Sequence, residues 1–94
     1  MNFVKGLDPE VKRSLINRLR RIEGQARGIQ RMVEEERDCM EVLSQLVAMR
    51  EAINRVGMQA LGCQLESDVR AEIVEGGTGE KAVSRVVEHF LKFT

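Results

Sequence analysis

Apolar and polar positions repeat with a helical period over the middle of the chain. Across residues 38–74, small or apolar side chains recur in steps of four and three, and this period of about 3.5 residues predicts a long helix with a coiled-coil-like seam. Asp38 is the expected N-cap, with Glu41 as its capping-box partner. Gly76 and Gly77 end the pattern. The seam consists of Val42, Leu46, Met49, Ile53, Val56, Ala60 and Cys63.

This central helix is too long to be buried by its own chain. At about 1.5 Å per residue, the helix spans roughly 55 Å. A chain of 94 residues cannot surround a rod of that length. Part of the seam therefore needs a partner, and we expect that partner to be a second copy of the chain.

A second long helix is predicted at about 9–36. Asp8 and Pro9 supply an N-cap and a first-turn proline. The short segment before the central helix implies an antiparallel helical hairpin. Gly24 and Gly28 lie inside this first helix and predict the close approach of a neighbouring helix. One stripe carries Val11, Leu15, Leu19, Ile22, Ala26, Ile29 and Val33.

A glycine-rich loop at 75–79 separates the central helix from a short third helix at about 80–92. The first seven residues are expected to form a loose arm. The sequence has no internal repeat and no low-complexity segment. Residues 1–94 are therefore predicted to form a single all-α domain of three helices, at about 9–36, 38–74 and 80–92.

The composition indicates the compartment. No apolar run approaches the roughly 20 residues of a membrane span, and no apolar segment typical of a signal peptide follows Met1. We therefore expect a cytoplasmic protein without a membrane partner. Its two cysteines are then predicted to be reduced, and reactive or ligating rather than joined in a structural disulfide.

Net charge is zero, yet the charges are unevenly distributed. Residues 1–31 carry eight basic and three acidic groups, whereas the remaining residues carry seven basic and twelve acidic groups. Such a chain can present one strongly basic surface. Arg18 and Arg21 lie along one flank of the apolar stripe of the first helix. A solvated helix face remains the alternative explanation for any single arginine.

Cys39 opens the central helix, where the helix dipole favours a thiolate. Cys63 lies 24 residues further on, which is about 36 Å along a continuous helix, so the two thiols cannot share a site within one chain. In an antiparallel pair of central helices, Cys39 of one chain would face residues 63–68 of the other. A small buried side chain is the alternative role for both cysteines, and especially for Cys63, which continues the seam.

Three further polar residues are candidates near the C-terminal end. Gln64 and Asp68 lie one turn apart and point the same way from the helix, an arrangement typical of a solvated or salt-bridged face. His89, the single histidine, is predicted to be a surface residue, because metal sites normally cluster several ligands.

The motifs NRLRRIEGQ at 17–25, Asp38-Cys39 and QLVAMR at 45–50 resemble the CsoR/RcnR/FrmR family of bacterial repressors, which sense copper, nickel or cobalt, and formaldehyde. The resemblance extends over about 8–92. It implies an antiparallel dimer of three-helix protomers that assembles into a tetramer, binds operator DNA, and releases it when an effector is sensed. It also implies DNA-binding roles for Arg18 and Arg55, with Arg21 beside Arg18.

The chain departs from this family at the effector site. Copper sensors of the family carry Cys, His and Cys at the positions equivalent to 39, 64 and 68, where this sequence has Cys39, Gln64 and Asp68. Amide and carboxylate oxygens suit Cu(I) poorly. Two hypotheses follow. In the first, Cys39 and Cys63 of another chain form a thiol pair, which reacts with an oxidant, persulfide or electrophile or binds a soft metal such as Cu(I). In the second, Cys39, Gln64 and Asp68 bind a metal.

We therefore predict a DNA-binding repressor that releases operator DNA when an intersubunit, cysteine-based site binds a copper-type metal or reacts with a thiol-reactive effector. The alternative is a helical oligomerisation or adaptor protein without DNA binding, in which Arg18, Arg21 and Arg55 would pair with Glu23 or Glu51. An enzyme is not expected, because the sequence has no phosphate-binding loop and no histidine beside a nucleophile.

Overall fold

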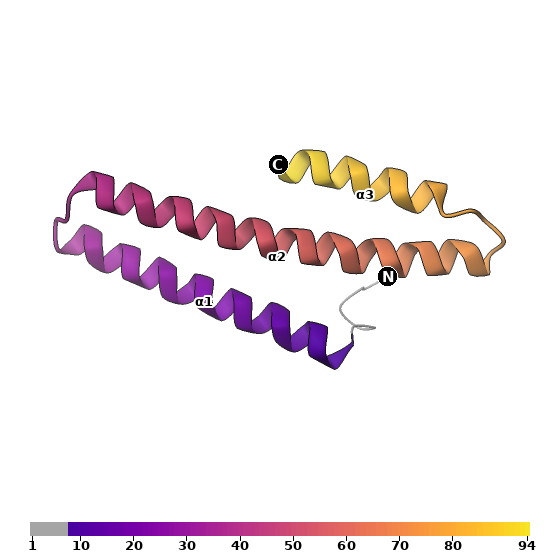
Figure 1. The fold of residues 1–94 in the computed structure, drawn as a ribbon, viewed down its shortest axis with the longest axis horizontal. Helices are drawn as coiled ribbons and strands as arrows, with labels where there is room; N and C mark the ends of the chain where they lie inside the picture. The colour runs from indigo at the N-terminus through magenta and orange to yellow at the C-terminus, as the bar shows by residue number, and fades with distance from the viewer. Residues whose placement is uncertain (1–7) are drawn as a thin grey trace.

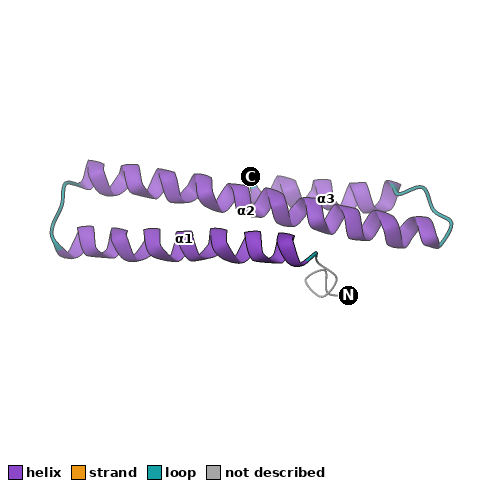
Figure 2. Cartoon of the chain, turned by 60° about the horizontal axis from the view of Figure 1, so that its bottom comes forward, coloured by secondary structure: helices purple, strands orange, loops and turns teal. Residues whose placement is uncertain are grey.

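A computed structural model describes residues 8–94, which form three helices: α1 (Pro9–Glu34), α2 (Cys39–Val74) and α3 (Glu80–Phe93). Figure 1 shows α1 and α2 as a long antiparallel hairpin, with α3 folded back along the second half of α2. The same arrangement is visible after rotation in Figure 2. No strand occurs in residues 8–94, so the all-α, three-helix prediction is confirmed. The arm predicted for the first seven residues lies outside the described part.

The hairpin begins with the two aspartate caps. Asp8 accepts a hydrogen bond from the backbone N–H of Glu10 at 2.8 Å, and Asp38 accepts one from that of Met40 at 3.2 Å. The capping box at α2 was predicted wrongly, because the Glu41 carboxylate instead accepts a hydrogen bond from Arg37 Nε at 2.9 Å. The guanidinium of Arg37 adds an attraction between two formal charges that the backbone N–H of Asp38 does not offer.

The end of α1 is set by a left-handed residue. Glu36 has φ 57°, and the backbone N–H of Arg37 returns to the carbonyl of Met32 at 3.0 Å. Helices commonly end on such a residue. The helix therefore ends at Glu34, two residues before the predicted boundary at 36.

Glu72, in the last turn of α2, fixes the start of α3. Its Oε2 accepts a hydrogen bond from the Gly79 N–H at 2.8 Å, and its Oε1 accepts one from the Ala82 N–H at 2.9 Å. Gly79 has no side chain to act as a cap, so Glu72 supplies the missing acceptors. Burial acts to raise the pKa of Glu72, but the backbone hydrogen bonds from Ala82, Gly79 and Lys81 together lower it.

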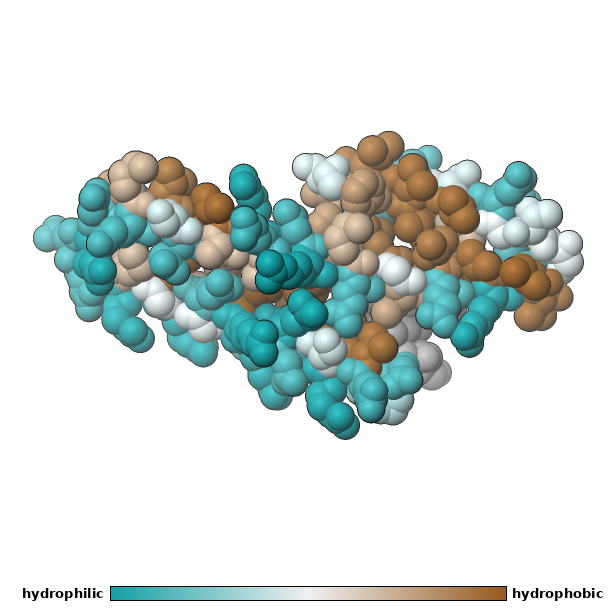
Figure 3. Space-filling model, viewed as in Figure 1, coloured by the Kyte–Doolittle hydropathy of each residue, from teal (hydrophilic) through white to brown (hydrophobic). Residues whose placement is uncertain are grey.

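A single protomer buries very little. Of the described residues, only Asp68, Gly79 and Ala82 are buried. The predicted seam is open in the protomer, since Leu46 is 41% and Ile53 is 42% exposed. Figure 3 shows a large group of apolar side chains over α3 and the adjacent part of α2. Exposed apolar area of this extent indicates surfaces that are covered by other subunits.

Glycines distinguish the contacts made within the protomer from those left open. A Cβ at Gly57 would overlap the ring of Phe93, so this glycine permits α3 to lie close to α2. In contrast, a Cβ at Gly24 or Gly28 would meet nothing within 4 Å. The close helix approach predicted for these two glycines is therefore not made inside the protomer.

Candidate functional site

Arg18 and Arg55 lie opposite each other across the α1–α2 hairpin. Gln59 Nε2 donates a hydrogen bond to Ser14 Oγ at 3.4 Å, which fixes the register of the two antiparallel helices. Arg18 is one turn along α1 from Ser14, and Arg55 is one turn back along α2 from Gln59. Both arginines therefore lie in the layer one turn beyond the Ser14–Gln59 contact, on the same face of the hairpin. Arg18 is half-buried and Arg55 is exposed.

Arg21 extends this basic layer along α1. A shallow depression of about 340 Å³ follows the first half of the helix. Its lining includes Asn17, Arg18 and Arg21, together with Glu10, Arg13 and Ser14. The side chain of Arg21 is exposed.

The three arginines have no carboxylate partner among residues 8–94. The ion pairs in this part of the chain involve Arg37, Arg70 and Arg85. Neither Glu23 nor Glu51 pairs with Arg18, Arg21 or Arg55, although the adaptor alternative predicted such pairs. Two unpaired cations in one layer repel each other, and a bound anion removes that repulsion.

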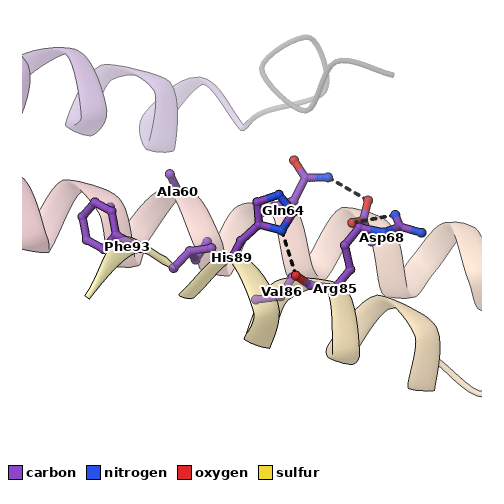
Figure 4. A pocket seen from close by; sticks show the side chains of 9 residues that line it. Ala60, Gln64, Asp68, Arg85, Val86, His89 and Phe93 are labelled. Carbon is purple, nitrogen blue, oxygen red and sulfur yellow. Dashed lines mark hydrogen bonds and ion pairs between the residues drawn. The ribbon is translucent and has the colours of Figure 1, made fainter. Parts of the chain in front are cut away.

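A second polar group lies further along α2, between α2 and α3. Asp68 is 8% exposed, and its Oδ1 accepts a hydrogen bond from Gln64 Nε2 at 2.8 Å. Its Oδ2 lies 3.5 Å from Nη1 of Arg85 on α3. Figure 4 shows these side chains meeting between the two helices. The sequence predicted a solvated or salt-bridged face at Gln64 and Asp68; the salt bridge is present, but Asp68 is buried rather than solvated.

These residues form the polar end of a groove of about 510 Å³. Gly57, Ala60, Leu61, Val86 and Phe93 form its apolar part, and Gln64, Asp68, Arg85 and His89 form its polar part. His89 is exposed, as predicted, but its place on this groove was missed. The only available signal was its spacing of four residues from Arg85, which gains meaning once the register of α2 and α3 is known.

The two cysteines lie far apart on α2. Cys39 is the first residue of the helix and is exposed, whereas Cys63 is half-buried beyond its middle; both are free thiols. The structure therefore does not bring Cys39 to Cys63, Gln64 or Asp68 within one protomer. Residues 8–94 of a single protomer contain no group of three His, Cys, Asp or Glu side chains that could hold a metal. A metal site with Cys39 thus requires a second subunit.

The donor chemistry separates one metal class from another. One thiolate, one amide oxygen and one carboxylate do not match Cu(I), which prefers soft sulfur ligands. A mixed sulfur and oxygen set suits borderline divalent ions of the zinc, cobalt and nickel type better. The residues therefore fit a divalent ion and do not fit Cu(I), unless Cys63 supplies a second sulfur.

Residues 11–92 match the model of the metal-sensitive transcriptional repressor family. The chain belongs to this family. It is 42% identical over 83 residues to the copper-sensing transcriptional repressor CsoR of Bacillus subtilis, which covers 88% of the chain and 81% of that relative. It is also 43% identical over 68 residues to the copper-sensing repressor RicR of Mycobacterium tuberculosis, covering 72% and 71% of the two chains.

Solved structures give the same assignment. The copper-sensing repressor CsoR with Cu(I) from Geobacillus thermodenitrificans superposes with a TM-score of 0.78 at 37% identity, over 93% of this chain and 90% of that one. The nickel-responsive transcriptional regulator InrS superposes with a TM-score of 0.72 at 36% identity, over 87% and 91%. The protein is therefore a transcriptional repressor and not an enzyme, and its partners are operator DNA and other copies of itself. No helix within residues 8–94 is both long and apolar enough to cross a membrane.

Proposed function

We propose that this repressor acts in the cytoplasm as a dimer of dimers and releases operator DNA when an effector occupies a site shared by two subunits. The observation that carries this proposal is the placement of the candidate ligands on α2. Cys39 stands at one end of a 36-residue helix, and Gln64 and Asp68 stand near the other. Antiparallel pairing of two such helices along their exposed seams brings Cys39 of one subunit to Gln64 and Asp68 of the next.

Arg18, Arg21 and Arg55 are proposed to contact the phosphates of the operator. Their support is the shared layer across the hairpin and the absence of carboxylate partners among residues 8–94. Arginine neutralises phosphate, and the displaced counterions make such binding strongly dependent on salt. Several subunits together repeat the same basic layer along the duplex.

The effector is proposed to be a metal ion bound by Cys39 of one subunit and by Gln64 and Asp68 of the other. The relatives named above sense copper, and one structural neighbour responds to nickel. The oxygen donors at 64 and 68 shift the expected preference of this chain toward a borderline divalent ion.

A second candidate effector is a thiol-reactive molecule. Both oxygens of Asp68 are already engaged, one by Gln64 and one by Arg85, whereas both cysteines are free. Cys39 and Cys63 of another subunit can then form a disulfide, as an oxidant accepts two electrons and the thiols lose two protons. A persulfide donor or a Cu(I) ion would use the same two sulfurs.

Fluorescence anisotropy with operator DNA tests both candidates. The reduced protein is titrated alone, then with Zn²⁺, Cu(I) or a persulfide donor, as wild type and as Cys39→Ala. Release by a metal that fails with Cys39→Ala supports the metal sensor. Release by the persulfide donor alone, with a crosslink between residues 39 and 63, supports the thiol switch. Failure of the reduced protein to bind DNA would contradict the proposed function.

A further inference from the structure

His89 on α3 and Gln64 on α2 line the same groove. The contact between Asp68 and Arg85 sets the register of these antiparallel helices. Gln64 lies one turn back from Asp68, and His89 lies one turn on from Arg85, so the two side chains occupy the next layer of the groove. Figure 4 shows the imidazole of His89 projecting from α3 toward α2 on the side of Gln64.

The hydrogen bond of His89 determines which ring nitrogen is free. Nδ1 lies 2.9 Å from the backbone carbonyl oxygen of Arg85. A carbonyl oxygen can only accept a hydrogen bond, so Nδ1 is the donor, and in the neutral imidazole the lone pair is then on Nε2. Histidines that bind metals commonly donate their second ring N–H to a backbone carbonyl in this way, because the bond fixes the tautomer and the ring orientation.

The same groove contains an almost fully buried carboxylate with a weakly held cation. Asp68 is 8% exposed, whereas the side chain of Arg85 is 61% exposed, and their closest approach of 3.5 Å is long for a charged hydrogen bond. A carboxylate removed from water is stabilised by a close cation. Arg85 supplies this charge only at a distance, so a metal ion in the groove would bind Asp68 more closely.

We infer that His89, through Nε2, and Asp68 are ligands of a divalent metal ion in the α2–α3 groove. This inference rests on the proposed function, because it adds His89 to the proposed ligands Gln64 and Asp68 and to Cys39 of the partner subunit. Nitrogen, carboxylate oxygen and thiolate together form a set that suits Zn²⁺ or Co²⁺ and not Cu(I). Asp68 and His89 come from one subunit and Cys39 from another, so a single protomer has no group of three His, Cys, Asp or Glu side chains among residues 8–94.

Co²⁺ binding to the reduced protein tests this inference, because Co²⁺ reports its ligands spectroscopically. The variants are His89→Asn, which retains an amide N–H near the position of Nδ1, Cys39→Ala, and Glu88→Ala as the control at an exposed neighbouring position. Because His89 is the only histidine in the sequence, any imidazole signal from the bound metal belongs to it. The readouts are the thiolate-to-cobalt charge-transfer band, the paramagnetically shifted exchangeable imidazole proton in the NMR spectrum, and the affinity for Co²⁺.

We expect wild type and Glu88→Ala to show both signals. His89→Asn should lose the imidazole proton and bind Co²⁺ about tenfold more weakly or worse, since even outer-shell changes at such sites weaken binding by about tenfold. If His89→Asn keeps wild-type affinity while Cys39→Ala loses the charge-transfer band, the shared thiolate site stands and His89 is not a ligand. If wild type shows no charge-transfer band, the Cys39 site and this inference both fail.

Discussion

The two helix contacts of the molecule, α1 on α2 and α3 on α2, treat their charges in opposite ways. Where α1 lies on α2, Arg18 and Arg55 share a layer, and no carboxylate among residues 8–94 pairs with them. Where α3 lies on α2, the carboxylates have partners: Asp68 binds Gln64 and Arg85, and Glu72 accepts two backbone N–H groups.

This difference indicates which kind of charge each contact can bind. Unpaired cations in one layer repel each other, and a polyanion that binds them offsets this repulsion. Paired carboxylates hold α3 against α2, and an incoming cation can replace one of their partners. A DNA-binding region and an effector-binding region can thus share one continuous helix, α2.

The largest predicted effect is the loss of operator affinity when the basic layer of Arg18 and Arg55 is removed. Replacing Arg18 and Arg55 together with Ala should weaken operator binding by about tenfold to a hundredfold, and should reduce the dependence of log K on log salt by about 0.9 for each phosphate that is no longer neutralised. Anisotropy titrations at several salt concentrations measure both. Arg70→Ala is the matched control, because Arg70 is paired with Glu66 at 2.7 Å. Equal affinity and equal salt slope for all variants would show that Arg18 and Arg55 do not contact DNA.

At the contact of α2 with α3, Gly57→Ala should destabilise the protein. The new Cβ would overlap the ring of Phe93, and overpacking of this kind costs about 1–3 kcal/mol. Gly62→Ala is the control, since no other atom of the protomer lies within 4 Å of a Cβ added there. Chemical denaturation at fixed chain concentration gives the comparison, and Phe93→Leu should partly rescue Gly57→Ala. If Gly57→Ala were as stable as Gly62→Ala, the close packing of α3 on α2 would be contradicted.

Glu72→Gln should weaken the attachment of α3 in a pH-dependent way. The pKa of Glu72 is lowered from its ordinary value of 4.5 in the folded protein, so its contribution is complete above that value and disappears as pH falls through the folded pKa. The thermal midpoint of Glu72→Gln should therefore lie below that of wild type at pH 7, and the gap should close at an acidic pH below the folded pKa. Glu75→Gln, in the exposed C-cap, serves as control. An equally large gap at both pH values would exclude the charged cap.

Arg85→Ala is expected to have the smallest effect. The guanidinium is 61% exposed and 3.5 Å from Asp68, so water screens its charge, and the buried Asp68 keeps its hydrogen bond from Gln64 when Arg85 is removed; we therefore expect a loss of about 1 kcal/mol. Denaturation curves of Arg85→Ala and Arg70→Ala should therefore be similar. A much larger loss of stability for Arg85→Ala would mean that Asp68 depends on Arg85 for its charge, and that no room is left for a competing cation.

The three helices could be predicted because their signals are local. Asp8, Pro9 and Asp38 mark helix starts, and the apolar period gives the helical extents. The capping box failed because a nearby charge competed: Arg37 attracts the Glu41 carboxylate away from the backbone. The same kind of local rule could not identify Glu72 as the cap of α3, because the acceptor lies on the preceding helix.

The site depends on register between helices, which periodicity alone does not contain. The meeting of Arg18 with Arg55 follows from the contact between Ser14 and Gln59. The placement of Gln64 and His89 on one groove follows from the geometry of the glycine loop and from the Asp68–Arg85 contact. A sequence places each residue on a helix face, but only packed helices decide which faces meet and at what level.

The most direct measurement of the shared site is a crosslink between residues 39 and 68. In the Cys63→Ser background, Asp68→Cys provides two thiols that lie 29 residues apart, or about 43 Å, on one helix, so a disulfide cannot form within a subunit. We predict that mild oxidation yields a covalent dimer joined between residues 39 and 68, whereas Arg70→Cys in the same background yields little. A protein that remains uncrosslinked at Asp68→Cys, or crosslinks equally at both positions, would contradict an effector site formed between antiparallel α2 helices.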